Sequence, residues 1–368
     1  MAFEFDSALQ ASAYRRVQDM DLGGLEALRL ILRGTSVIDW RRLHFRDAAE
    51  VDHFLRLNLF DLSDQRDARR LRAILDQAVE YLRKAFGYQV AAAVAQPADL
   101  REVFLFASGA IEPKKYGRIA CVVLKCMHVV HHLEARELLF RTPIREADLA
   151  ERVDRRVMSE ARRMRQLGLP VVELVGNVKA RGSLITKLLA KRETVAAQIF
   201  DRVRYRIVTE RRDQIPSVLN HLARTLFAFN YVVPGQSQNT LLRFREIVGL
   251  HPDADALIPQ LQAPLDIEAQ DRRKANAFSG KGFRVLNFVV DLPVRVDEFL
   301  PPDRPFADDL GRVVFSLVEF QVVDAATARR NEEGESNHGR YKRRQSRNVL
   351  RRLSRGLVVP KRRKRRKE

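Results

Sequence analysis

Cysteine and tryptophan are scarce in this chain: 368 residues include two cysteines, Cys121 and Cys126, and one tryptophan. The cysteines are five positions apart in an apolar helical pattern, where a disulfide would be poorly shaped. We therefore expect two reduced thiols, as in proteins of the cytosol, and a cytoplasmic location.

Long apolar runs are also missing. No stretch reaches the roughly 18 uninterrupted apolar residues of a membrane helix. The first residues, Met1 to Asp6, do not place a basic segment before an apolar core, so we expect no secretory signal and no membrane partner. A hydrophobic content of 46% and a charged content of 31% are typical of a globular protein, and the length allows two domains.

Acidic residues are too few to balance the basic ones, and the formal net charge is +19. Residues 340–368 contain fifteen Lys and Arg and a single acid, Glu368, which gives this end +14 and leaves about +5 for the rest. A concentrated cationic segment suits a polyanion, and RNA or the ribosome is the expected partner. The alternative is a solvated, disordered tail. A helical apolar stripe favours contact with a partner; it consists of Val349, Leu350, Leu353, Leu357 and Val358.

Residues 1–168 show one helical pattern after another. Clear examples are 48–59, 67–86, 116–139 and 146–168, the last closed by Gly168 and Pro170. This helical domain is suited to regulation, oligomerisation or docking. The sequence does not indicate which role it has, and it leaves the oligomeric state open.

Strand and helix patterns mix in the second half of the chain. Strands are expected at 171–175, 203–208, 285–290 and 313–323, and helices at 183–192 and 215–229. The fold class is therefore α+β, with a helical half followed by a mixed-sheet domain at 169–342 and a basic tail at 343–368. Residues 251–281 resemble a long irregular insertion.

Candidate functional residues cluster around these strands. Lys179, Ser183 and Lys187 are spaced four apart between a strand and a helix, where ammonium groups, a hydroxyl and free backbone amides suit a triphosphate. Asp201 precedes a second strand, and its carboxylate together with that of Glu319 suits Mg²⁺. Ordinary alternatives are a solvated helix face for Lys187 and a turn cap for Asp201. A purely structural role is harder to assign to Glu319 and Gln321, because they interrupt the apolar alternation of Val313, Phe315 and Leu317.

These residues resemble the synthetase domain of the RelA/SpoT family of alarmone (ppGpp) synthetases, over about 171–342. The family motif Arg-x-Lys-x-x-x-Ser-x-x-x-Lys stands here with Asn177 in place of its arginine. Four later motifs follow in the family's order: Asp201 with Arg206-Ile207, the segment from Gly282 to Asn287, Glu319-Phe320-Gln321, and His338 to Lys342.

The resemblance implies a nucleotidyltransferase-like fold that moves pyrophosphate from ATP to a ribose 3′-hydroxyl of GDP, GTP or an RNA or tRNA end. Catalytic roles fall to Asp201, Glu319 and Gln321, with Asp201 and Glu319 holding Mg²⁺. The ATP-binding residues are Lys179, Arg181, Ser183, Lys187 and Arg206. The acceptor-binding residues are Phe283, Asn287, His338, Tyr341 and Lys342.

Departures from the family pattern concentrate on the acceptor side. Phe283 replaces a tyrosine, Val285 a serine and Asn287 a histidine, and Val323 stands where the family has an arginine. Two functions therefore remain open: a pyrophosphokinase, including one with a changed acceptor, or a catalytically inactive protein that binds nucleotide or RNA.

Two further features carry less weight. Cys121, His128 and His132 share one side of a predicted helix, which suits a metal ion but more often marks core packing. The chain has no His-Asp pair, so we expect none of the hydrolase activity that long members of the resembled family carry.

Overall fold

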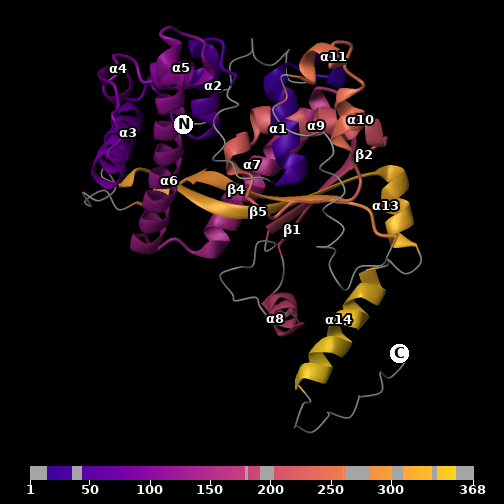
Figure 1. The fold of residues 1–368 in the computed structure, drawn as a ribbon. Coiled ribbons are helices and arrows are strands. Elements are labelled where there is room, and N and C mark those ends of the chain that lie inside the picture. Colours follow the sequence, from indigo (N-terminus) through magenta and orange to yellow (C-terminus); the bar gives the residue numbers. More distant parts are fainter. Residues whose placement is uncertain are drawn as a thin grey trace, which may run out of the picture.

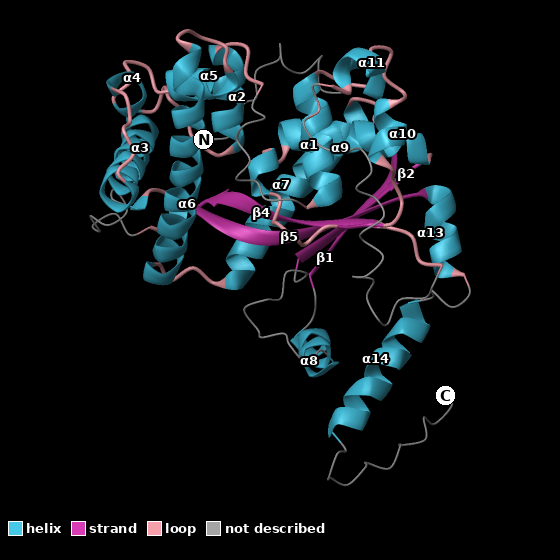
Figure 2. Cartoon of the chain, in the orientation of Figure 1, coloured by secondary structure: helices cyan, strands magenta, loops and turns pink. Residues whose placement is uncertain are grey.

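The computed structural model describes residues 15–34, 44–178, 181–190, 203–259, 261, 282–300, 310–333 and 338–353. Helices form the first half of the chain, and a sheet dominates the second (Figures 1 and 2). The first helices are α1 (Leu22–Arg33), α2 (Ala48–Leu57), α3 (Gln65–Phe86), α4 (Ala92–Ala95), α5 (Arg101–Ser108), α6 (Gly117–Arg141) and α7 (Glu146–Gln166). The strands are β1 (Val171–Val178), β2 (Val203–Thr209), β3 (Gln238–Asn239), β4 (Leu286–Arg295) and β5 (Val313–Asp324). The later helices are α8 (Arg181–Ala190), α9 (Ile215–Thr225), α10 (Phe244–Val248), α11 (Ala254–Leu257), α13 (Ala325–Glu332) and α14 (His338–Leu353).

Side-chain caps define the ends of the N-terminal helices. The carboxylates of Asp21, Asp47 and Asp64 each accept a hydrogen bond from a backbone N–H in the first turn of α1, α2 and α3. Gly87 ends α3 with φ 68°, a left-handed conformation that glycine adopts without steric cost. These local signals explain why the helices predicted from the sequence pattern are present in the structure with nearly the same ends.

The sheet has the strand order β1-β2-β5-β4-β3 in the described part of the chain. β2 and β5 run parallel, and the other neighbouring pairs are antiparallel. The mixed sheet, with helices before and around it, confirms the predicted α+β class. β5 lies at the centre of the sheet, so its residues have a strand neighbour on both sides.

One face of the sheet is packed against helices and forms the core. Tyr205, Phe288 and Phe320 share this face and are almost completely buried, and their rings lie 5.4 to 5.9 Å from one another along the row. α7 and α9 contact β5 from this region, and α1 contacts α9 in turn. Figure 1 shows α1, α7 and α9 together on one side of the sheet.

The other face is only partly covered by helices. At the Phe315 end of β5 the ring of His132 from α6 stacks on Phe315 at 4.2 Å. Because side chains alternate along a strand, Glu319 and Gln321 point to the same side as Phe315, two and three further steps along. On this side α8 and α14 lie below the sheet in Figure 1, opposite α1, α7 and α9, and they contact each other.

The helical half docks onto the sheet through polar anchors as well as apolar packing. Asp67 at the start of α3 receives two hydrogen bonds from Arg295 at the end of β4, at 2.8 and 2.9 Å. The ring of His53 bonds to the carbonyl of Arg224 at 2.7 Å. The apolar core also runs without a break from α1 to β5. The domain boundary at 168/169 stays a prediction.

Differences from the expected elements are informative. β1 extends to Val178 and β4 to Arg295, three and five residues beyond the predicted ends, because pairing continues on the neighbouring strand. The expected irregular insertion contains α11, and beside it His251 is buried; residues 262–281 lie outside the described part. α14 shows that the basic tail begins as a helix, with Val349 buried and Leu350 and Leu353 exposed.

No helix in the described part of the chain is both long enough and apolar enough to cross a bilayer.

Candidate functional site

Glu319 lies at the centre of the partly open face. It occupies the middle of the long central strand β5, and only 4% of its surface is exposed. Gln321, two residues along, points to the same side and is half-buried. The predicted Glu-x-Gln pair is therefore placed side by side on one strand, on the polar side of the sheet.

Strand register brings two arginines and an asparagine to these residues. On β2, Arg204 pairs with Glu319 and Arg206 with Gln321. On β4, Asn287 pairs with Gln321. The face thus carries two guanidinium groups on one flank of β5 and an amide on the other.

The carboxylate of Glu319 accepts hydrogen bonds from both flanks. Arg204 Nε donates to Oε2 at 2.6 Å, and Asn287 Nδ2 donates to Oε1 at 2.6 Å. An ionised carboxylate this far from water is costly without such partners. The guanidinium of Arg204 supplies the charge, and the amide of Asn287 fixes the orientation. Glu319 is therefore a neutralised carboxylate in this structure.

Asn287 has a second polar atom that is not used. Its Oδ1 is buried and accepts no hydrogen bond within the described part of the chain. A buried acceptor without a donor is unfavourable, so this atom is suited to a ligand hydroxyl or amino group. The finding is compatible with the acceptor-binding role predicted for Asn287.

Arg206 is paired with an exposed carboxylate, whereas Arg204 is paired with a buried one. Both of its terminal nitrogens donate to Oε1 of Glu332 on α13 at 3.1 Å, and its Nε lies 4.0 Å from Glu173 Oε1 on β1. The side chain of Glu332 is 66% exposed. A pair of this kind contributes little and exchanges easily with another anion.

The predicted triphosphate motif lies on and before α8. Ser183 is in the first turn of α8 and is exposed to solvent. Arg181 and Lys187 belong to the same helix, but their side chains lie outside what the structure describes. Lys179 and Asp201 fall outside the described residues altogether. Their predicted roles therefore stay predictions.

The remaining acceptor-side residues are divided between two regions. The ring of Phe283, just before β4, is half-buried against the core. Lys342 is exposed on α14, the helix that contacts α8. His338 and Tyr341 are also on α14, and their side chains are not described. The structure thus groups Glu319, Gln321, Arg206 and Asn287 on the sheet, and Ser183 and Lys342 on the two helices below it.

Comparison with known proteins gives one kind of match. The chain is similar to solved alarmone synthetases. Small alarmone synthetase 1 from Bacillus subtilis is 15% identical, with a TM-score of 0.30, over 55% of this chain and 86% of that chain. The same protein bound to its product pppGpp gives a TM-score of 0.31, over 55% of this chain and 87% of that chain. A GTP pyrophosphokinase family protein from Streptococcus pneumoniae is 13% identical, with a TM-score of 0.30, over 56% of this chain and 83% of that chain.

No protein-family model and no curated protein matches the chain. The matched structures are the kind of protein that the sequence motifs resemble. TM-scores near 0.3 describe a loose superposition, so the function proposed below rests on the residues of this chain.

The described residues do not by themselves form a magnesium site. Mg²⁺ prefers carboxylate oxygens. The described carboxylates at this face are already paired with arginines: Glu319 accepts from Arg204 and from the amide of Asn287, and Glu332 and Glu173 flank Arg206. Within the same part, His, Cys, Asp and Glu side chains nowhere gather in groups of three that suit a metal ion. Asp201, the second predicted ligand, lies outside it.

The residues of the weaker metal hypothesis do not converge. Cys121 is buried with its Sγ 3.6 Å from the carbonyl of Ala107, on α5. His128 and His132 lie together elsewhere on α6, with ring centres 4.4 Å apart, and His132 faces Asp291. The core interpretation of these residues is thus the one that fits their surroundings.

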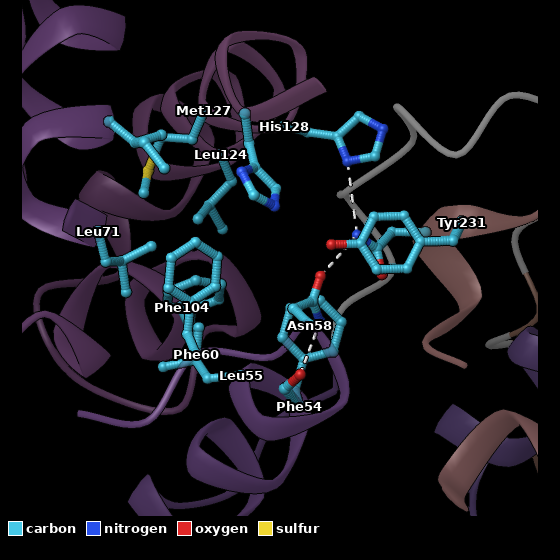
Figure 3. Close-up of a pocket in the computed structure, with 13 residues that line it drawn as sticks. Phe54, Leu55, Asn58, Phe60, Leu71, Phe104, Leu124, Met127, His128 and Tyr231 are labelled. Atoms are coloured by element: carbon cyan, nitrogen blue, oxygen red, sulfur yellow. Dashed lines mark hydrogen bonds between the residues drawn. The ribbon is translucent and has the colours of Figure 1, made fainter. Parts of the chain in front are cut away.

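A small cavity lies between the helical half and the turn that holds Asn230 and Tyr231, beside these histidines. Its volume is about 40 Å³, and Figure 3 shows His128, Asn58 and Tyr231 around it. Asn230 donates to Asn58 Oδ1 at 3.1 Å across the same boundary. Burial lowers the pKa of His128 to about 3. A space of this size holds water but no nucleotide, so it is separate from the candidate site.

Arg204 is the site residue that sequence reasoning missed. The alternation of β2 placed Arg204 and Arg206 on one face, which is a real signal. It did not reveal that this face adjoins Glu319, which is 115 residues away in sequence.

Proposed function

We propose that the chain binds nucleoside triphosphate on the polar face around Glu319 and transfers pyrophosphate from ATP to a ribose 3′-hydroxyl. The observation that carries this proposal is the convergence of Glu319, Gln321, Arg206 and Asn287 on adjacent strands. The order of the motifs, which resembles that of alarmone synthetases, suggests pyrophosphate transfer as the reaction. Asp201, Lys179, Arg181, Ser183 and Lys187 complete the site, with Mg²⁺ entering together with ATP.

The reaction is a displacement at the β-phosphorus. The acceptor 3′-oxygen forms the new bond, the bond from the β-phosphorus to the bridging α,β-oxygen breaks, and AMP leaves. Such transfers depend mainly on positioning and charge neutralisation. Arg206 neutralises phosphate charge after its contact with the exposed carboxylate of Glu332 breaks. Asn287 Oδ1 accepts a hydrogen bond from the acceptor nucleotide. Glu319 accepts the proton of the 3′-hydroxyl once Arg204 has moved from it.

A second function is favoured by one specific contact. A carboxylate neutralised by a guanidinium is a poor base, and the Arg204–Glu319 contact at 2.6 Å is of that kind. A protein that binds nucleotide or RNA without catalysis would keep this contact permanently. Three alternatives are therefore tested in one experiment: transfer to GDP or GTP, transfer to an RNA end, and binding without catalysis.

The experiment incubates the full chain with labelled ATP, Mg²⁺ and GDP, GTP or bulk tRNA. The proposal predicts a pyrophosphorylated product with one of these acceptors, which is lost in Glu319→Gln and kept in Glu151→Gln. Glu151 is an exposed carboxylate on α7 and serves as the matched control. Absence of product with every acceptor, together with retained binding of ATP, would favour the inactive protein.

Contact with RNA or the ribosome is proposed for the basic end of the chain. α14 exposes Arg343, Arg347 and Arg351 at spacings of four residues, which places them on one side of the helix. A row of this kind follows a phosphate backbone. Its affinity for RNA should fall steeply as salt rises, and removal of residues 343–368 should abolish the salt-dependent part.

A further inference from the structure

Arg204 and Glu319 form a pair that is built into the sheet. They face each other in the register of two parallel strands at the sheet's centre, so neither residue depends on a loop for its position. The side chain of Glu319 is 6% exposed and that of Arg204 is 29% exposed. The carboxylate is thus the buried partner of the pair, and the arginine is the partner that a ligand can reach.

We propose that Arg204 is an internal counter-ion that keeps divalent cations off Glu319 in the ligand-free protein. This inference concerns the site of the proposed function and adds a control to it. A divalent cation that approaches Glu319 meets a carboxylate whose charge is already balanced and whose Oε1 is held by Asn287. Binding there would require separating a buried ion pair and leaving a guanidinium beside the cation, both of which are unfavourable.

The chemistry of arginine makes the block reversible. A guanidinium binds phosphate as well as carboxylate, in a fork geometry that a triphosphate satisfies. A phosphate-bearing ligand on this face therefore competes with Glu319 for Arg204. In the proposed reaction the ion pair opens before Glu319 accepts a proton.

The test measures Mn²⁺ binding to the full chain in the absence of nucleotide. The electron paramagnetic resonance signal of free Mn²⁺ gives the amount that remains unbound. Wild type and Glu319→Gln should bind Mn²⁺ equally, within about twofold, because Glu319 is not a ligand while Arg204 is paired with it. Arg204→Gln keeps an amide that can bond to the buried carboxylate but removes the charge. This variant should gain a site at least tenfold tighter than any in wild type, and Arg204→Gln/Glu319→Gln should lose it.

Arg162→Gln is the matched control. It removes the same charge from an exposed position on α7, away from the polar face, so its Mn²⁺ affinity should equal that of wild type. The proposal is overturned if Glu319→Gln weakens Mn²⁺ binding in the wild-type background. It is equally overturned if Arg204→Gln, shown to be folded by its thermal transition, binds Mn²⁺ like wild type. If Arg204→Gln does not fold, the first comparison decides alone.

The outcome is independent of the transfer assay. A chain that binds no ATP still shows the predicted Mn²⁺ pattern if Arg204 shields Glu319. If the chain transfers pyrophosphate and Glu319 also binds Mn²⁺ in the wild type, the proposed function holds and the shielding by Arg204 is refuted.

Discussion

Arg204 and Glu319 lie opposite one another on adjacent parallel strands, and Nε of the arginine donates to Oε2 of the glutamate at 2.6 Å. The pair neutralises the buried carboxylate of the Glu-x-Gln motif. It therefore links the stability of the central sheet to the chemistry available on its polar face.

Glu319→Gln should destabilise the fold by about 1–3 kcal/mol, because it leaves the half-buried guanidinium of Arg204 facing a neutral group. Urea unfolding measures the loss. Glu332→Gln is the control, since it breaks the exposed pair with Arg206 and should cost less than about 1 kcal/mol. Equal losses in the two variants would show that the buried Arg204–Glu319 pair contributes no more to the free energy of unfolding than the exposed pair does.

Asp67→Asn should weaken the docking of the helical half on the sheet. Asp67 is 7% exposed and receives both terminal nitrogens of Arg295, so the expected loss is about 2–4 kcal/mol in urea unfolding. Asp297 bonds to the Nε of the same arginine but is more exposed. Asp297→Asn should therefore cost less than about 1 kcal/mol, and the reverse order would contradict the assignment of Arg295 as an anchor.

Stability should fall as the pH is lowered below 6.5. Burial, with His132 nearby, lowers the pKa of His128 to about 3, and burial also lowers the pKa of His131 well below 6.5. The unfolded chain then binds protons that the folded chain does not, so stability present above pH 6.5 is lost as the pH falls toward 3. The loss between pH 6.5 and 5.5 should be about 1 kcal/mol for each histidine.

Urea unfolding of wild type and His128→Gln at both pH values measures this effect. The variant should lose less stability than wild type over the interval. Wild-type stability that stays constant or rises as the pH falls would contradict the burial of neutral histidines.

Gly176→Ala should disturb the strand that leads to α8. A Cβ atom at Gly176 would lie 2.7 Å from the ring of Tyr205, which is buried and bonded through its hydroxyl to Asp154. The expected cost is about 1–3 kcal/mol in urea unfolding. A Cβ atom at Gly182 in α8 would meet no neighbouring side chain or other element within 4 Å in the described part of the chain, so Gly182→Ala should be neutral or slightly stabilising. A neutral Gly176→Ala would show that Tyr205 has room to move.

Local patterns predicted the elements but not all of their neighbours. α3 was predicted from its apolar period, and the capping carboxylate of Asp64 sets its start. The shared face of Glu319 and Gln321 followed from strand alternation. The contacts of Glu319 with Arg204 and Asn287 depend on which strands adjoin and in what register, and residues far apart in sequence decide that. Propensity likewise does not determine that β1 continues through Asn177, since pairing with β2 holds it there.

Binding of a non-transferable ATP analogue tests the central claim, that the polar face around Glu319 is a nucleotide site. Calorimetry with adenosine 5′-(α,β-methylene)triphosphate compares wild type, Arg206→Glu and Arg162→Glu, the last an exposed arginine on α7 at the opposite face. The account predicts at least tenfold weaker binding for Arg206→Glu and less than a twofold change for Arg162→Glu. Equal effects of the two reversals, or no binding by wild type, would contradict it.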